Sequence, residues 1–201
     1  MLVVSNLFFE YADDPLLSDV SFAVRAGELL HVKGENGAGK STLLKLIASL
    51  LDPLSGEIKF ENVPLQDCLE HYRAQMCYLG HLEGVHPLLT PKDVWTFEST
   101  HTKDTPSLDA IADLLQLSDF LDTPFAFLSA GQKKRVGMIR LAMKQAARVW
   151  LLDEPWAALD AAGTDQLLRL TLKHLESGGV LITTSHHPLP VTSFSVREYI
   201  L

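Results

Sequence analysis

The sequence predicts a single α/β domain with a parallel central sheet, and three observations support this fold class. Apolar runs of strand length alternate along the chain with segments whose apolar residues recur at helical spacing. The run at 149–152 is apolar without a break, which is typical of a parallel strand buried on both faces. Residues 29–48 are predicted to form a strand, a glycine-rich loop and a helix in that order.

The other elements follow from the same patterns, taken from the N-terminus. We expect strands at 2–9, 20–24, 29–32, 57–60, 76–80, 149–152 and 180–184, and an edge strand at 195–201. We expect helices at 41–48, 66–74, 108–117, from about 128 to 146, and at 162–177. Another helix start is predicted at Thr90, which is followed by a proline and, at the third helical position, by Asp93. The segment 84–148 is therefore mainly helical, and we interpret it as an insertion into the core of the single domain 1–201.

Composition and charge argue against assigning this chain to several classes of protein. The formal net charge is −8, which disfavours free nucleic acid or an anionic membrane surface as the main partner. The basic run Lys133-Lys134-Arg135 is interpreted as the solvated face of a helix, with a patch that binds phosphate or lipid as the alternative. Cys68 and Cys77 show neither metal-ligand spacing nor a disulfide framework. The N-terminus does not resemble a signal peptide, and no apolar stretch approaches the roughly 18 residues that span a bilayer. We therefore expect a cytoplasmic protein that meets a membrane only through a partner.

The glycine-rich loop at 34–41 matches G-x-x-x-x-G-K-[ST], the phosphate-binding P-loop. Its glycines let backbone N–H groups turn inward around an anion, and the N-terminus of the following helix adds a partial positive charge. Lys40 is predicted to reach the β- and γ-phosphates of a nucleotide, and Ser41 to bind Mg2+. The alternative is a glycine-rich turn before an ordinary helix. The predicted nucleotide contacts are Gly34, Glu35, Asn36, Gly37, Ala38, Gly39, Lys40, Ser41 and Thr42.

Two further strand ends carry groups suited to phosphate chemistry. In an open parallel sheet, ligands bind beyond the carboxyl ends of the strands. Asp153 follows the strand at 149–152 and suits Mg2+, bound directly or through water. Glu154 can polarise the water that attacks the γ-phosphate, and a placed general base is typically worth about 10²–10⁴ in rate. The alternative interpretation is that Asp153 and Glu154 are a solvated pair of acids in a loop. His186 follows the strand at 180–184.

Together these motifs resemble the ATP-binding cassette (ABC) family of transport ATPases, and the resemblance covers nearly the whole chain. The segment Leu128-Ser129-Ala130-Gly131-Gln132 is similar to the LSGGQ signature of that family, with Ala130 in place of the first glycine. Asp160 matches the aspartate of the D-loop, and His186 matches the switch histidine. Tyr11, which could otherwise be a packing residue, matches the aromatic residue that stacks on adenine. The resemblance implies a RecA-like P-loop core with an antiparallel N-terminal β subdomain and an inserted α-helical subdomain.

The resemblance also implies cofactors, a partner copy and roles for the site residues. The cofactors are ATP and Mg2+. In this family two cassettes dimerise head to tail, and ATP lies between the P-loop of one subunit and the signature of the other. Ser129 and the N–H groups beside it would then complete the γ-phosphate cage from across the interface. Glu154 would be the base, His186 would position the γ-phosphate and the water, and Asp160 would couple the two sites.

One position departs from the family pattern. His81 stands where the family usually has a glutamine that contacts Mg2+ and the attacking water, so the identity of the metal contact is open here. A neutral imidazole can accept or donate a hydrogen bond, whereas a protonated one would repel the metal. The family uses the following loop to contact its transmembrane subunits. We therefore expect the loop from His81 to Leu89 to contact integral membrane subunits.

The chain resembles one group within that family more narrowly. Leu79-Gly80-His81, the LSAGQ signature and the segment 183–189 are similar to the ATPase subunits of haem exporters for cytochrome c maturation. This implies a peripheral ATPase on the cytoplasmic face of the inner membrane. Direct haem binding is not expected, because the switch role explains His186 and the chain has no C-x-x-C-H motif. The alternatives are the ATPase of another small ABC exporter, and an ABC protein acting on ribosomes or DNA, against which the acidic charge counts.

Overall fold

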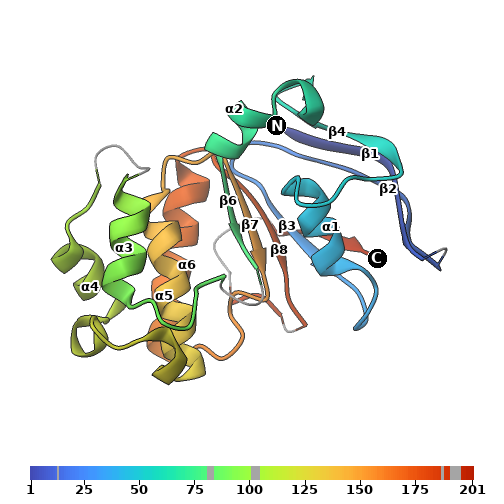
Figure 1. Ribbon diagram of the computed structural model, residues 1–201. Coiled ribbons are helices and arrows are strands. Elements are labelled where there is room, and N and C mark those ends of the chain that lie inside the picture. The colour runs from blue at the N-terminus through green and yellow to red at the C-terminus, as the bar shows by residue number, and fades with distance from the viewer. Residues whose placement is uncertain (13, 81–83, 101–104, 187, 191–195) are drawn as a thin grey trace.

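The structure, a computed structural model, describes residues 1–201 apart from 13, 81–83, 101–104, 187 and 191–195. Its N-terminal part forms a four-stranded antiparallel sheet in the order β2-β1-β4-β5 (Figure 1). The strands are β1 (Leu2–Tyr11), β2 (Asp14–Val24), β4 (Ser55–Phe60) and β5 (Val63–Pro64). β1 and β2 are longer than the sequence predicted, because they pair from end to end as a hairpin. This sheet is the expected antiparallel β subdomain.

A second sheet carries the functional elements. Its order is β6-β7-β8-β3-β9, formed by β6 (Met76–Leu79), β7 (Val149–Asp153), β8 (Val180–Thr184), β3 (Leu29–Lys33) and β9 (Val196–Ile200). Every pairing in it is parallel. β7 and β8 are buried along their whole length, and for β7 this agrees with the unbroken apolar run at 149–152. β9 lies at the edge of the sheet, as expected for the C-terminal segment.

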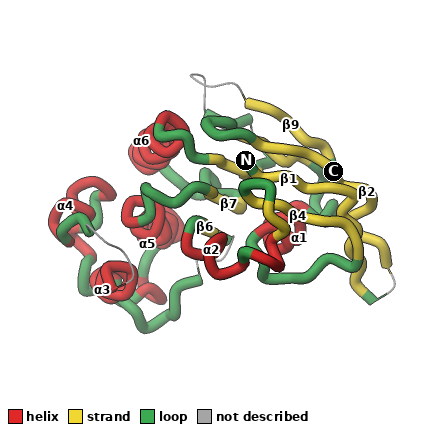
Figure 2. The backbone as a smooth tube through the Cα atoms, turned by 90° about the horizontal axis from the view of Figure 1, so that it is seen from above, coloured by secondary structure: helices red, strands yellow, loops and turns green. Residues whose placement is uncertain are grey.

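The parallel sheet is covered on both faces, which gives the molecule two hydrophobic cores (Figures 1 and 2). α1 (Lys40–Ile47) packs between the two sheets, and α5 (Ala130–Met143) and α6 (Ala161–Glu176) cover the opposite face. β7 shows the division residue by residue. Val149 and Leu151 pack with α1, whereas Trp150 and Leu152 pack with α5 and α6. Each such side chain stabilises the fold by about 1.5–3 kcal/mol on burial, so the position of β7 is strongly fixed.

Two segments connect these layers. α2 (Leu69–Ala74), preceded by a 3-10 turn at 65–67, leads from the antiparallel sheet into β6. α3 (Pro91–Thr100) and α4 (Leu108–Leu115), with 3-10 turns at 118–120 and 125–127, lie between β6 and α5 in the chain (Figure 2). The helical character predicted for 84–148 thus holds for the described residues of that segment. Among the described residues, no helix combines the length and apolar character that a bilayer crossing needs.

The helical segment is fixed by a cap and by an ion triad around one buried glutamate. Thr90 Oγ1 accepts the Asp93 N–H at 3.2 Å, and Asp93 Oδ2 accepts the Thr90 N–H at 2.9 Å, as the sequence predicted for this helix start. Glu98 of α3 is buried and lies 2.7 Å from Arg140 Nε and 3.7 Å from Lys144 Nζ. A buried carboxylate needs such partners, so the triad fixes α3 against α5.

Two details of α5 differ from the sequence prediction. The helix ends at Met143 rather than near 146, because the Lys144 carbonyl accepts the Ala147 N–H and the Trp150 Nε1–H instead of continuing the helical ladder. The basic run after the signature is not a solvated face. Lys134 is buried and Arg135 is bonded to Asp160, so that interpretation was wrong.

His174 of α6 is a buried histidine that makes stability depend on pH. Its ring stacks on Trp150 with 4.1 Å between ring centroids, and its Nε2–H donates to the Val180 carbonyl oxygen at 3.1 Å. Burial lowers the pKa of His174 from 6.5 to about 4. The unfolded chain therefore takes up a proton before the folded chain does, and the folded state loses stability as the pH falls.

We expect the free energy of unfolding to fall between pH 6.5 and pH 4, with about 3 kcal/mol of the change coming from His174. The variant His174→Phe removes this titration and keeps an aromatic ring against Trp150. Urea unfolding of both proteins at several pH values should show that the stability of the wild type relative to the variant falls by about 3 kcal/mol from pH 6.5 to pH 4. A difference that stays constant over this range would contradict the account.

Candidate functional site

Three neighbouring strands, β3, β7 and β8, end at one pocket. The register pairs Val32 with Thr184 and Thr184 with Asp153, so the segments that follow the three strands leave the sheet at the same edge. The pocket has a volume of about 420 Å3. Its lining residues are Leu16, Asn36, Gly37, Gly39, Lys40, Ser41, Thr42, Asp153, Glu154, Ala157 and His186. The structure thus gathers much of the P-loop, both acids and His186 around one space.

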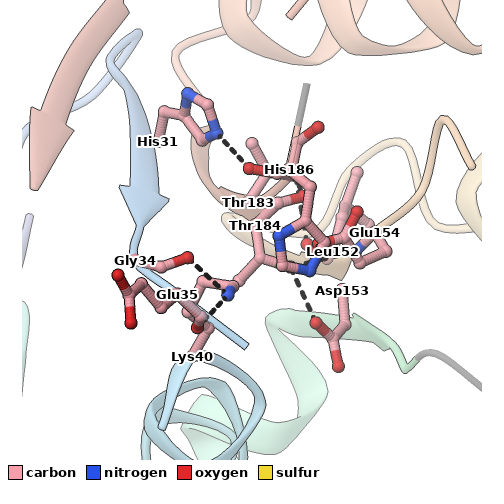
Figure 3. Close-up of polar contacts among 11 residues, drawn as sticks. His31, Gly34, Glu35, Lys40, Leu152, Asp153, Glu154, Thr183, Thr184 and His186 are labelled. Carbon is pink, nitrogen blue, oxygen red and sulfur yellow. Dashed lines mark hydrogen bonds and ion pairs between the residues drawn. The ribbon is translucent and has the colours of Figure 1, made fainter. Parts of the chain in front are cut away.

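The P-loop reaches α1 through a left-handed glycine. Gly39 is the N-cap of α1 with a φ of 95°, and a Cβ there would lie 2.8 Å from Leu17 Cδ2, so only glycine fits. Lys40 Nζ donates to the carbonyl oxygens of Gly34 and Glu35, both at 2.8 Å (Figure 3). An ammonium group has three N–H donors, so one remains for a phosphate oxygen. The loop therefore holds the Lys40 side chain in place and leaves one N–H donor of its ammonium group unused.

Asp153 and Glu154 are bonded to the same hydroxyl. Thr184 Oγ1 donates to Asp153 Oδ1 at 2.7 Å and accepts the Glu154 N–H at 3.0 Å (Figure 3). Glu154 has a φ of 51°, in the left-handed region that residues other than glycine rarely adopt. Its Oε1 is buried and accepts no hydrogen bond from the described residues. This oxygen can therefore accept a proton from a water in the pocket.

His186 lies beside that oxygen. Its Nε2 is 3.2 Å from Glu154 Oε1, within ion-pair distance but not aligned as a hydrogen bond. The carbonyl oxygen of the preceding residue, Ser185, is 3.2 Å from His31 Nε2 (Figure 3). Burial lowers the pKa of His31, so a neutral ring donates to this carbonyl and holds the segment that carries His186. The role of His31 could not be predicted from the sequence, because nothing in the pattern of β3 distinguishes it from a packing residue.

The donors in the pocket fit Mg2+. This ion prefers hard oxygen ligands and usually keeps several waters. Ser41 and Asp153 bring a hydroxyl and a carboxylate to the same pocket, and the bond from Thr184 occupies only Oδ1 of Asp153. No cluster of three or more His, Cys, Asp or Glu that could hold a metal occurs in the part of the chain that the structure describes. A bound Mg2+ would therefore complete its coordination with nucleotide oxygens and water.

The signature residues Leu128 to Gln132 lie at the start of α5, and none of them lines the pocket. Ser129 is the N-cap: its Oγ accepts the Gln132 N–H at 3.3 Å, and Gln132 Oε1 accepts the Ser129 N–H at 2.8 Å. Ser129 and Ala130 are exposed. A Cβ on Gly131 would lie 3.1 Å from the carbonyl oxygen of Ala158, the first residue of the D-loop segment 158–160, so the signature and the D-loop are in close contact. Because the start of α5 lies outside the pocket, its free N–H groups can bind only a ligand that is not held in the pocket of the same chain.

Asp160 is the N-cap of α6 and is tied to α5. Its Oδ1 accepts the Gly163 N–H at 2.8 Å, and both of its carboxylate oxygens are 2.7 Å from Arg135 Nη2. Arg135 Nη1 also donates to Gln116 Oε1 at 2.8 Å. The Gly163 N–H and the Arg135 guanidinium hold the pKa of Asp160 below its usual value. Arg135 thus joins the D-loop to the signature helix, a contact that the sequence analysis missed.

Several predicted contacts are not placed in the pocket. Gly34, Glu35 and Ala38 of the P-loop do not line it, although the first two supply carbonyl oxygens to Lys40. Tyr11 is 50% exposed and packs edge-on against Phe9, with 4.8 Å between ring centroids. Its stacking on adenine stays a prediction, and Leu16, which the sequence did not single out, lines the pocket. His81 lies outside the described residues, so its metal contact also stays a prediction.

Comparison with known sequences agrees with this geometry. The family model described as ABC transporter matches residues 17–157. The cytochrome c biogenesis ATP-binding export protein CcmA of Legionella pneumophila is 42% identical over 199 residues, which cover 99% of both chains. The protein of the same name from Escherichia coli K12 is 36% identical over 198 residues, which cover 98% of this chain and 95% of the other.

Solved structures show the same fold. The ATP-binding subunit of an ABC transporter aligns with a TM-score of 0.82 at 27% identity, over 92% of this chain and 80% of that chain. A bacterial ABC transporter cassette solved as a dimer aligns with a TM-score of 0.76 at 24% identity, over 93% of this chain and 88% of that chain. These alignments confirm the expected α/β core with its antiparallel β subdomain and helical insertion. With a family match over most of its length and relatives that align from end to end, the chain belongs to the ABC transporter family, as an ATP-binding cassette.

Proposed function

We propose that this protein is the ATP-hydrolysing subunit of a haem-export type transporter for cytochrome c biogenesis. The observation that carries the ATPase assignment is the pocket in which Lys40, Ser41, Asp153, Glu154 and His186 meet. The assignment to cytochrome c biogenesis is supported by relatives that bear this name and align over nearly the whole chain. The ATPase of another small exporter would share all of this chemistry and would differ only in its membrane partner.

The residues of the pocket account for hydrolysis step by step. Lys40 and the N–H groups at the start of α1 bind the β- and γ-phosphates of ATP. Ser41 and Asp153 would hold a bound Mg2+, which would neutralise phosphate charge. Glu154 takes a proton from water as the water oxygen bonds to the γ-phosphorus, and the bond from that phosphorus to the bridging oxygen of ADP breaks. The products are ADP and phosphate. His186, 3.2 Å from Glu154 Oε1, positions the γ-phosphate and the water.

A second copy of the chain would complete the site. Ser129 and the start of α5 are exposed and lie outside the pocket of their own chain, although they have the N–H groups and hydroxyl that bind phosphate. In a head-to-tail homodimer, they would face the γ-phosphate held by the partner's P-loop. A cassette of the same fold has been solved as a dimer, which supports this arrangement.

An apolar patch on the helical segment suits a membrane subunit. It consists of Leu88, Leu89 and Phe127, and backbone bonds from Phe125 to Leu89 and from Ala126 to Pro87 hold its two segments together. Leu88 is 73% and Phe127 is 79% exposed, and exposed apolar residues that lie together mark contact sites more often than exposed apolar residues that stand alone. Leu88 and Leu89 belong to the loop from His81 to Leu89, for which the sequence predicts contact with integral membrane subunits, and Phe127 lies on the segment bonded to that loop. Through this contact the protein would lie on the cytoplasmic face of the inner membrane.

We expect Glu154→Gln to bind ATP normally and to accumulate as an ATP-bound dimer, because the amide keeps the shape of the pocket but cannot take the proton. Steady-state hydrolysis should fall by about 10²–10⁴, the usual worth of a placed base. Phosphate release and size-exclusion chromatography with ATP measure the two effects. Asp165→Asn is the matched control, because Asp165 is an exposed acid of α6 that pairs only with Arg169 among the described residues. Near-normal hydrolysis by Glu154→Gln would remove Glu154 from the role of base.

The transport assignment is tested in a strain that lacks this gene. The wild-type gene should restore holo-cytochrome c, and Lys40→Ala should not, because it removes the phosphate-binding ammonium group. The double variant Leu88→Asp/Phe127→Asp should also fail in the strain, while the purified protein keeps its ATPase activity, because charge on the apolar patch blocks docking but leaves the pocket intact.

Leu54→Asp is the control for the patch, since Leu54 is 59% exposed but belongs to the segment before β4. It should restore holo-cytochrome c. Normal holo-cytochrome c in the deletion strain itself would contradict the assignment to cytochrome c biogenesis and favour another exporter. Restoration by the double patch variant would exclude the patch as the membrane contact.

A further inference from the structure

Thr184 contacts both acids of the site without reaching the pocket. It is the last residue of β8, is fully buried and does not line the pocket. The register places it beside Asp153 of β7. Its Oγ1 lies 2.7 Å from Asp153 Oδ1 and 3.0 Å from the Glu154 amide nitrogen (Figure 3). One buried hydroxyl therefore bonds to the side chain of one acid and to the backbone of the other.

Chemistry decides which group donates in each of these bonds. A carboxylate can only accept and a backbone N–H can only donate, whereas a hydroxyl has one hydrogen and two lone pairs. The hydrogen of Thr184 must therefore point at Asp153, and a lone pair must receive the Glu154 N–H. Threonine is stiff at χ1 because its Cβ is branched, and Thr184 is fully buried from bulk solvent. The arrangement has no alternative set of partners in the described structure.

We propose that Thr184 is a positioning residue for ATP hydrolysis. Its hydroxyl fixes the Asp153 carboxylate, so that Oδ2 remains for the metal, and it holds the backbone of Glu154 at a φ of 51°. A glutamate in the left-handed region is strained, and it persists only where its surroundings hold it there. The proposal rests on the proposed function, in which Asp153 holds Mg2+ and Glu154 is the base.

The adjacent residue offers a matched control. Thr183 is also fully buried in β8, but its hydroxyl donates to the Leu152 carbonyl oxygen at 3.0 Å and bonds to neither acid. Thr184→Val and Thr183→Val each replace one buried hydroxyl by a methyl group of similar size. Both should lower thermal stability, whereas only Thr184→Val should alter the geometry of the acids.

We expect kcat for ATP hydrolysis to fall about tenfold to a hundredfold in Thr184→Val, because a charged and a neutral partner both lose their hydrogen bond. Binding of a fluorescent ATP analogue without Mg2+ should stay within about twofold of the wild type, since the P-loop is untouched. Thr184→Ser keeps the hydroxyl and should restore most of kcat. Thr183→Val should retain the kcat of the wild type. Thr184→Ala removes the same hydroxyl and gives the same comparison if Thr184→Val does not fold.

A measurement without nucleotide or Mg2+ tests the contact itself. In urea unfolding, Thr184→Val and Asp153→Ala should be non-additive, with the double variant less destabilised than the two single variants predict together. The proposal is overturned if the two effects add, if Thr184→Val keeps the kcat of Thr183→Val, or if Thr184→Ser fails to restore kcat. Absence of ATPase activity in the wild-type protein would instead contradict the proposed function, and the unfolding result would still decide the contact.

Discussion

The parallel register of β3, β7 and β8 is the constraint on which the rest of the structure depends. It pairs Val32 with Thr184 and Thr184 with Asp153, so the P-loop, the acids and His186 leave the sheet together. Side chains alternate between the faces of a strand, so a shift of one residue would exchange the residues that face α1 with those that face α5 and α6. It would also separate Thr184 from Asp153. The apolar packing on both faces of the sheet therefore stabilises the fold and fixes the strand register on which the geometry of the site depends.

The same architecture separates the starts of two helices, α1 and α5, to which the proposed function assigns phosphate binding. α1 begins at the pocket, with Gly39 as its left-handed N-cap, whereas α5 begins outside the pocket, with Ser129 and Gln132 in a capping box. The D-loop is bonded to the second of these, because Arg135 of α5 holds Asp160 and the Ala158 carbonyl lies against Gly131. A displacement of the exposed start of α5 would therefore also displace the start of α6 and the segment after Glu154. This physical connection is what a two-copy site requires if the sites are to act together.

The sequence predicted what depends on local pattern. The unbroken apolar run of β7, the strand-loop-helix order around Lys40 and the cap at Thr90 each arise from neighbouring residues, and each is present in the structure. That Asp153 and His186 line one pocket followed from the rule that parallel strands present ligands at their carboxyl ends. The contacts of Thr184, His31 and Arg135 could not be predicted, because they depend on which strands and helices are neighbours. In the sheet, β8 lies between β7 and β3, although β3 is far from both of them in the chain. No local pattern specifies that order.

The central claim, that the pocket is half of a site completed by the signature of a second copy, is tested most directly by mixing two inactive variants. Lys40→Ala lacks the phosphate-binding ammonium group, and Ser129→Arg blocks the exposed start of α5. Each purified variant alone should hydrolyse ATP at background rate. In a one-to-one mixture, a mixed dimer has one intact site, so activity should return to at most about a quarter of the wild-type value. Full activity of Ser129→Arg alone, or a mixture that stays at background although mixed dimers form, would contradict the account.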